Sequence, residues 1–146
     1  TRVGQDGKYF VINKFRTMRV DAEDDSGPVW ASPEDPRVTK IGRWLRLTRL
    51  DEVPQLYNVL AGHMSFVGPR PERPFFVEEL SQSIEFYPLR LTVKPGVTGW
   101  AQVNGFRGNT SIKDRIKYDL FYLENWSLSL DFKVLAKTFF SRENAY

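Results

Sequence analysis

Asp51 and Glu52 are the residues whose type and position point most directly to chemistry. These adjacent carboxylates lie in the stretch TRLDEVPQLYNVL at residues 48–60, shortly after Arg46 and Arg49. A helix start rich in N–H groups and near arginines is an anion site, and phosphate is the usual anion there. The two acids are therefore candidates for phosphate chemistry.

One interpretation of the pair is structural. Asp51 would be the N-cap of a helix that begins at Val53, and Pro54 suits the first turn of that helix. Unpaired N–H groups and the positive end of the helix dipole would then keep Asp51 ionised. A cap explains one acid, but it does not explain two acids beside several arginines.

The other interpretation is catalytic. A carboxylate that receives a phosphate needs a cation to screen the repulsion between them. Mg²⁺ held by oxygen ligands can do this, and it leaves the second carboxylate available as a nucleophile. This interpretation predicts phosphoryl transfer through an aspartyl-phosphate type of intermediate.

Two further charged residues are candidates for the site. Arg70 lies between Pro69 and Pro71, and because each proline fixes its own φ, the cation is preorganised for phosphate. Asp119 lies on a predicted helix and has two open interpretations, namely substrate binding or an ion pair with a Lys or Arg of the protein.

Composition limits the chemistry to carboxylates and cations. The chain has no cysteine and a single histidine, His63, which excludes a thiol nucleophile, a disulfide framework and a Cys-ligated zinc site. Its 21 Lys and Arg against 18 Asp and Glu give a net charge of +3, too small for a general polyanion binder. No nucleic-acid-binding motif is present, so we expect no nucleic-acid partner.

The length of 146 residues fits one domain, and the pattern predicts an α+β fold of mostly short amphipathic helices around a small β-hairpin or sheet. A tight turn at Asp6-Gly7 before the strand-forming run 9–12 predicts the hairpin. Helices are predicted over 40–50, 53–60, 75–87 and 113–124, the last capped by Ser111, followed by the segment 128–140. Residues 97–103 predict a short strand. Residues 21–37 predict a mobile loop around an extended piece near Val29-Trp30.

Five segments, in one order over nearly the whole chain, resemble the bacterial sugar transferases. These are the polyprenol-phosphate glycosyl-1-phosphate transferases, or monotopic phosphoglycosyl transferases. The segments are RVGQDGKYFVINKFRTM at 2–18, DPRVTKIGRWLRLTRLDEVPQLYNVLAG at 35–62, MSFVGPRPE at 64–72, KPGVTGWAQVNG at 94–105 and YDLFYLENWSLSLDFKVLAKT at 118–138.

The resemblance implies a two-step reaction. Asp51 would attack the β-phosphorus of a nucleoside diphosphate sugar, usually a UDP-sugar, and expel UMP. Polyprenyl (undecaprenyl) phosphate would then take the phosphosugar and start polysaccharide or glycan assembly. Glu52 would be the Mg²⁺ ligand, with Mn²⁺ as an alternative metal. Substrate-binding roles would fall to Lys14, Arg46 and Arg107, alongside Arg49, Arg70 and Asp119.

The resemblance also bears on location. The family carries an apolar membrane-inserted helix just before the segment that matches Thr1-Arg2-Val3, and this chain lacks it. We therefore expect residues 1–146 to be one catalytic domain, a fragment of a protein at the cytoplasmic face of the bacterial inner membrane. The segment from Trp126 to Phe140, with Lys133 and Lys137, is either ordinary core or partly a membrane-surface segment. The sequence does not determine whether the protein forms a homo-oligomer.

Two other points stay open. The family usually has an acidic residue at the position of His63, so the role of that acid is not carried over. An alternative function is a non-catalytic nucleotide-sugar or polyanion binding module, in which the arginines bind and the dyad is only a cap.

Overall fold

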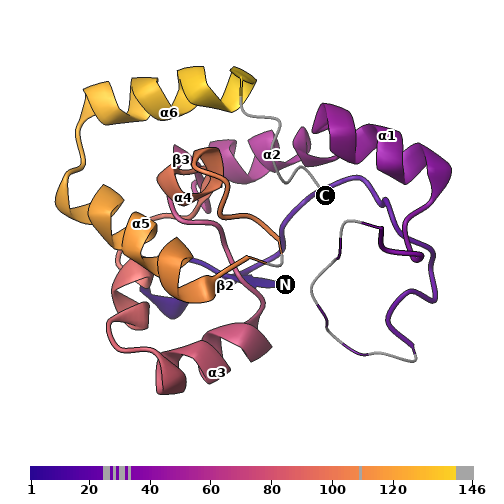
Figure 1. Cartoon of the computed structure of the whole chain (residues 1–146), viewed down its shortest axis with the longest axis horizontal. Helices are drawn as coiled ribbons and strands as arrows, with labels where there is room; N and C mark the ends of the chain where they lie inside the picture. The colour runs from indigo at the N-terminus through magenta and orange to yellow at the C-terminus, as the bar shows by residue number, and fades with distance from the viewer. Residues whose placement is uncertain (25–26, 28, 30–31, 33, 109, 141–146) are drawn as a thin grey trace.

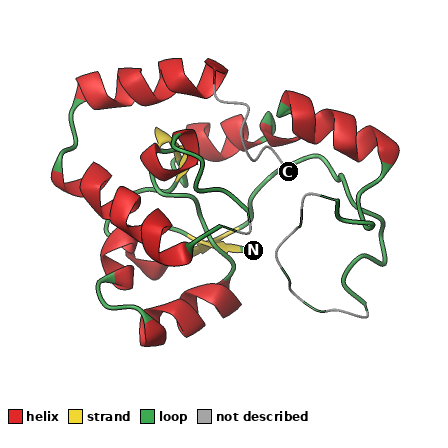
Figure 2. Ribbon diagram, in the orientation of Figure 1, coloured by secondary structure: helices red, strands yellow, loops and turns green. Residues whose placement is uncertain are grey.

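The computed structural model describes residues 1–24, 27, 29, 32, 34–108 and 110–140 and has an α+β architecture dominated by helices (Figures 1 and 2). The α-helices are α1 (Lys40–Thr48), α2 (Gln55–Leu60), α3 (Pro74–Ser83), α4 (Trp100–Val103), α5 (Ile112–Glu124) and α6 (Leu128–Phe140). Short 3₁₀ turns form η1 (Gln5–Gly7), η2 (Leu50–Glu52) and η3 (Tyr87–Leu91). The predicted fold class is confirmed.

Two small sheets accompany the helices. Strands β1 (Arg2–Val3) and β2 (Tyr9–Phe10) form an antiparallel hairpin. Asp6 and Gly7 make its turn with φ angles of 56° and 74°, a conformation that Gly and Asp tolerate best. The predicted hairpin is therefore confirmed.

The second sheet is a parallel pair of β3 (Ser65–Val67) and β4 (Gly96–Thr98). The sequence predicted a strand over 97–103, and this prediction was wrong beyond Thr98 because the chain turns at once into α4. Gly96 permits the close pairing, since a Cβ on it would lie 2.1 Å from the backbone nitrogen of Gly68. The Gly96 N–H then donates to the Pro69 carbonyl at 2.9 Å, which fixes the start of the Pro-Arg-Pro loop.

The hydrophobic core lies between the second sheet and the C-terminal helices. Val67, Val103, Tyr122 and Val134 form its buried centre, and they come from β3, α4, α5 and α6. Figure 1 shows α5 and α6 as the long helices that frame this side of the molecule. The predicted Ser111 cap is confirmed, because its hydroxyl accepts from the Asp114 N–H at 3.3 Å.

Helices α1 and α2 turn their apolar side chains toward solvent. Along α2, Leu60 is 87% exposed while Asn58 is 1% exposed, so the polar side of the helix faces the protein. In α1, Gly42 is the buried residue, and Ile41, Trp44 and Leu47 are exposed to solvent. We call the exposed apolar residues of the two helices the apolar surface. They are Ile41, Trp44, Leu47, Leu56, Tyr57 and Leu60.

Several helices begin or end at other residues than predicted: α1 ends at Thr48 instead of Leu50, and α2 begins at Gln55 instead of Val53. The helix predicted over 75–87 ends at Ser83, and η3 takes up the chain from Tyr87. Within 21–37, the described residues contain neither helix nor strand. Trp30 and several neighbours lie outside the described residues, as do parts of the predicted extended piece and mobile loop.

Candidate active site

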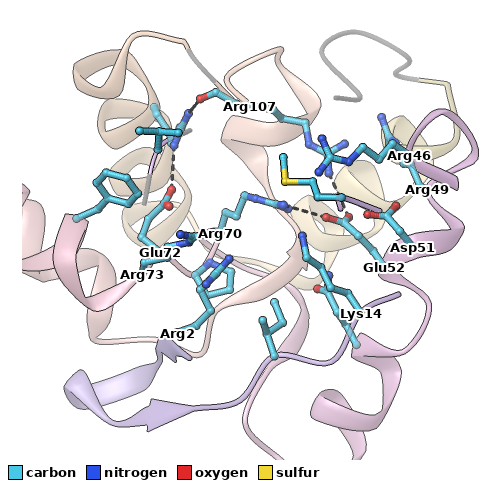
Figure 3. Close-up of a pocket in the computed structure, with 18 of the residues that line it drawn as sticks. Arg2, Lys14, Arg46, Arg49, Asp51, Glu52, Arg70, Glu72, Arg73 and Arg107 are labelled. Atoms are coloured by element: carbon cyan, nitrogen blue, oxygen red, sulfur yellow. Dashed lines mark hydrogen bonds and ion pairs between the residues drawn. The ribbon is translucent and has the colours of Figure 1, made fainter. Parts of the chain in front are cut away.

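A strongly charged pocket lies where η2, the Pro-Arg-Pro loop and the segment after the hairpin meet (Figure 3). Its lining contains eight cationic side chains and four carboxylates, so its net charge is positive. The cations are Arg2, Lys14, Arg46, Arg49, Arg70, Arg73, Arg107 and Arg115, and the carboxylates are Glu23, Asp51, Glu52 and Glu72. Such a pocket suits an anionic ligand carrying more than one negative charge.

Asp51 and Glu52 lie on η2 and not at the cap of a regular helix. The prediction that Asp51 caps a helix from Val53 was wrong, because α2 begins at Gln55 without a side-chain cap. The turn already pairs its own N–H groups: Glu52 and Val53 donate to the carbonyls of Arg49 and Leu50, each at 3.2 Å. The side chain of Asp51 is thus left to the pocket that it lines.

Lys14 is brought to the dyad by anchors on both sides of it in the chain. Before it, the Asn13 N–H donates to Asn58 Oδ1 at 2.9 Å, and Asn58 Nδ2 donates to the Val11 carbonyl at 2.7 Å. After it, the Phe15 N–H donates to the Asp51 carbonyl at 3.0 Å. Lys14 therefore has a defined place in the pocket lining.

Arg46 and Arg49 reach the pocket from the end of α1. Arg46 Nε donates to Thr17 Oγ1 at 2.9 Å. Arg49 ends α1 in the left-handed region with φ of 57°, and its guanidinium donates to the Thr138 carbonyl at 3.0 Å. The left-handed residue turns the chain directly into η2, so both arginines and the dyad share one pocket.

Arg70 and Arg107 hold the two oxygens of Glu52. Arg70 donates to Oε1 at 2.9 Å and Arg107 to Oε2 at 3.3 Å. Burial opposes the charge on Glu52, but the two arginines outweigh it and lower its pKa to about 2. Glu52 is therefore ionised at any physiological pH.

Asp51 has a different environment from its neighbour. Burial and the adjacent Glu52 charge raise its pKa, while Lys14, Arg46 and Arg70 oppose the rise. A carboxylate with a raised pKa is more basic, which favours it as a nucleophile over the strongly paired Glu52. The two acids thus have environments that suit different roles.

The donor set fits a magnesium ion. Among the described residues, no group of three or more His, Cys, Asp or Glu side chains is arranged to hold a metal. Mg²⁺, however, usually takes one or two carboxylates and completes its shell with substrate phosphates and water. Glu52 can supply one such carboxylate, because a carboxylate has about four acceptor positions and Glu52 uses two for its arginines.

Asp119 does not line the pocket. Its carboxylate is 2% exposed and lies behind the pocket, in an ion pair with Arg90 at 2.8 Å. This pairing with an arginine was the other interpretation that the sequence left open for Asp119.

The structure thus brings together seven of the predicted site residues, namely Lys14, Arg46, Arg49, Asp51, Glu52, Arg70 and Arg107. His63 is exposed and stacks on Phe10, outside the pocket lining.

Sequence reasoning missed the half of the pocket around Glu72. Arg115 donates to Glu72 Oε1 at 2.9 Å, and Arg73 forms an ion pair with Glu23 at 2.5 Å. Figure 3 shows Arg2, Glu72 and Arg73 on the side of Arg70 away from the dyad. Glu72 and Arg2 lie within the segments at 64–72 and 2–18 that carry the resemblance, whereas Glu23, Arg73 and Arg115 lie outside all five segments.

The chain was compared with known proteins. A family model described as bacterial sugar transferase matches residues 1–143. The chain is 49% identical over 144 residues to the UDP-glucose:undecaprenyl-phosphate glucose-1-phosphate transferase of Escherichia coli (strain K12). This match covers 96% of this chain and 31% of that protein. It is 42% identical over 139 residues to the UDP-N-acetylgalactosamine-undecaprenyl-phosphate N-acetylgalactosaminephosphotransferase of Aeromonas hydrophila, with 94% of this chain and 33% of that protein covered.

A third relative is an uncharacterized sugar transferase of Bacillus subtilis (strain 168), 44% identical over 137 residues, with 94% of this chain and 64% of that protein covered. The chain spans about a third of the length of the Escherichia coli and Aeromonas relatives. The family match extends over nearly all of the residues that form the fold and the pocket. The chain therefore belongs to the bacterial sugar transferase family.

Proposed function

We propose that the protein transfers a sugar 1-phosphate from a UDP-sugar to polyprenyl (undecaprenyl) phosphate and releases UMP. The product, a polyprenyl diphosphate sugar, would start the assembly of a polysaccharide or glycan. The names of the Escherichia coli and Aeromonas relatives describe reactions of this type with different sugars, so the proposal does not specify which sugar is transferred.

The observation that carries the proposal is the unequal pair of carboxylates in a cationic pocket. Glu52 is neutralised by Arg70 and Arg107, whereas Asp51 is buried and has a raised pKa. Asp51 is thus the better nucleophile, and the surrounding cations let a diphosphate approach it.

In the first step, an oxygen of Asp51 attacks the β-phosphorus of the donor. The bond between that phosphorus and the oxygen bridging to the α-phosphate breaks, and UMP leaves with the electron pair. Lys14, Arg46 and Arg107 are placed to neutralise charge on the phosphoryl oxygens. A phosphosugar then remains on Asp51.

In the second step, a phosphate oxygen of the lipid acceptor attacks the same phosphorus. The bond to Asp51 breaks, which restores the carboxylate and yields the polyprenyl diphosphate sugar. We propose that Mg²⁺, or Mn²⁺ in its place, is held by Glu52 and the donor diphosphate, which leaves Asp51 available as the nucleophile. A bound divalent cation would neutralise charge on the diphosphate and polarise the phosphoryl group.

The lipid acceptor requires the pocket to work beside a membrane. Among the described residues, no helix is long and apolar enough to cross a bilayer. The apolar surface of α1 and α2 supports a proposed membrane contact, and so do exposed aromatic residues of α6 such as Phe132 and Phe139. We place the full-length protein at the cytoplasmic face of the bacterial inner membrane, where UDP-sugars are available.

The test uses full-length protein in membranes and a UDP-sugar radiolabelled in the sugar. Without acceptor, wild-type protein should release UMP in a burst and keep labelled sugar phosphate. Asp51→Asn should lose both signals, whereas Asp131→Asn, a matched change on α6, should retain them. If UMP appears only after polyprenyl phosphate is added and no label stays on the protein, Asp51 is a base and not the nucleophile.

The same experiment separates the enzyme from a binding module. A module would bind UDP-sugar without releasing UMP, with or without acceptor. Asp51→Asn would then leave its affinity for the donor unchanged.

A further inference from the structure

Arg90 is the centre of a buried hydrogen-bond cluster directly behind the pocket. It lies on η3 and is 4% exposed, its Nε donates to Asp119 Oδ2 at 3.1 Å, and its Nη2 forms an ion pair with the same oxygen at 2.8 Å. Its Nη1 donates to the hydroxyl of Tyr87 at 3.0 Å, and its Nη2 donates to the Arg70 carbonyl at 2.9 Å. All three nitrogens of the guanidinium therefore have protein partners.

The residue whose carbonyl Arg90 holds is also the residue that holds Glu52. The Arg70 guanidinium donates to Glu52 Oε1 at 2.9 Å and to Gln102 Oε1 at 3.3 Å. Arg70 is thus fixed at its backbone by Arg90 and at its side-chain end by two acceptors. The Arg70 carbonyl, which accepts from Arg90 at 2.9 Å, is therefore the backbone group through which Arg90 holds the middle of this loop.

Asp119 stabilises the charge of the buried Arg90. Burial disfavours the guanidinium charge, but Asp119, Tyr87 and Glu72 outweigh burial and raise the pKa of Arg90 above its usual range. A buried ion pair is weak evidence for stability, because removing both charges from water costs as much as their attraction returns. Orientation is the better explanation for this pair, since the arginine reaches a backbone group of a pocket residue.

We infer that Asp119 and Arg90 are positioning residues, which hold the Arg70 backbone so that its guanidinium is aimed into the pocket. The inference rests on the proposed function, because it assigns to Arg70 the binding of the donor diphosphate. Asp119 would thus affect donor binding without touching the substrate, because it holds Arg90 and Arg90 holds the carbonyl of Arg70.

A double-mutant cycle in the full-length protein tests this inference. Arg70→Lys keeps the charge but loses the forked geometry, and Asp119→Asn removes the charge that orients Arg90. We expect each single change to raise the donor KM by about tenfold, the usual scale for one charge-assisted hydrogen bond. The double variant should also show about a tenfold rise, because once the fork is lost its positioning no longer matters.

Independent effects would give a rise of about a hundredfold in the double variant, and that result would overturn the inference. Tyr122→Phe is the matched control, because it removes a 2.7 Å hydrogen bond from the same helix to Asp131 on α6. It should lower thermal stability and leave the donor KM unchanged. A control that raises the donor KM as much as Asp119→Asn would also contradict the inference.

If Asp119→Asn does not fold, Tyr87→Phe takes its place in the cycle. This change removes the hydrogen bond that Arg90 donates to the Tyr87 hydroxyl but keeps the ion pair with Asp119. It should raise the donor KM by about threefold in the wild-type background and not in Arg70→Lys. An equal rise in both backgrounds would count against positioning. Wild-type UMP release is measured first, so that failure of the proposed function is separate from failure of this inference.

Discussion

The backbone N–H of Phe15 donates to the carbonyl oxygen of Asp51 at 3.0 Å. This bond joins the segment after the hairpin to the turn that carries the dyad, across more than 30 residues of chain. Because Asn13 is tied to Asn58 on the other side, Lys14 is held between two anchors. The cation nearest to the dyad in this segment therefore has its position set by the backbone.

The first prediction concerns the pH dependence of donor use. Burial, followed by repulsion from Arg70, lowers the pKa of Lys14 to about 8, although contact with solvent on the open side of the pocket moderates the effect. Lys14 is charged below this pH and neutral above it. We expect kcat/KM for the UDP-sugar to fall as the pH rises through about 8, and Lys14→Arg to remove that fall.

The measurement is initial UMP release at low donor concentration between about pH 7 and 9.5, a range that brackets the shifted pKa. Lys117→Arg, at a 75% exposed side chain on α5, is the control and should keep the wild-type profile. The folding consequence has the opposite sense: a lowered folded pKa makes stability rise with pH between about 8 and the ordinary Lys value. An unchanged decline in Lys14→Arg would show that another group titrates.

The second prediction concerns the metal. Glu52→Gln keeps the shape of the side chain but removes the charge that Arg70, Arg107 and a divalent cation share. We expect the Mg²⁺ concentration for half-maximal UMP release to rise by at least about tenfold, the scale seen when support of a metal site is lost. Glu72→Gln changes a carboxylate of the same pocket that pairs with Arg115, and it should not change the metal requirement. Full wild-type activity in excess chelator would contradict the proposed metal role.

The sequence predicted much of the site because its signals are local. Adjacent acids with arginines just before them and an arginine between prolines can each be read within a few residues. They located five residues of the pocket lining, namely Arg46, Arg49, Asp51, Glu52 and Arg70, whereas Lys14 and Arg107 came only from the family resemblance. Asp119 shows the limit of such reasoning. Its partner Arg90 is 29 residues away, and only the packing of α5 against η3 shows that the two form a buried pair.

The errors in secondary structure also have physical causes. The Asp51 cap was wrong because a left-handed Arg49 starts a separate turn, and no local pattern requires a non-glycine residue to adopt that conformation. The repeat in α2 predicted the helix correctly but not which side is buried. Its polar residues Gln55 and Asn58 face the protein, because Asn58 satisfies the backbone of the segment that carries Lys14.

The third prediction tests the contact that sets Arg46. A Cβ on Gly42 would lie 2.0 Å from the carbonyl oxygen of Thr17, and the Thr17 hydroxyl accepts from Arg46 Nε. Gly42→Ala must therefore push α1 away from this segment, at a cost of about 1–3 kcal/mol for an overpacked site. We expect faster thermal inactivation of the full-length protein in detergent and a higher donor KM. Arg43→Ala, an exposed change on the same helix, should change neither, and a stable Gly42→Ala enzyme would show that the contact can relax.

The last prediction concerns the apolar surface of α1 and α2. If this surface lies in the membrane, it presents the pocket to the lipid acceptor, and it has no role in the reaction with the soluble donor. The two half-reactions should therefore respond differently to Trp44→Gln combined with Leu47→Gln. We expect the acceptor KM to rise by about tenfold, because burying one such side chain is worth roughly 1.5 kcal/mol or more. The UMP burst without acceptor should stay unchanged.

Phe75→Gln, at a 58% exposed aromatic residue of α3, is the control for the loss of exposed apolar area and should leave both half-reactions as they are. A double variant with a wild-type acceptor KM would place the membrane contact elsewhere on the protein, whereas a diminished burst would mean that these side chains support the fold around Arg46 and Arg49.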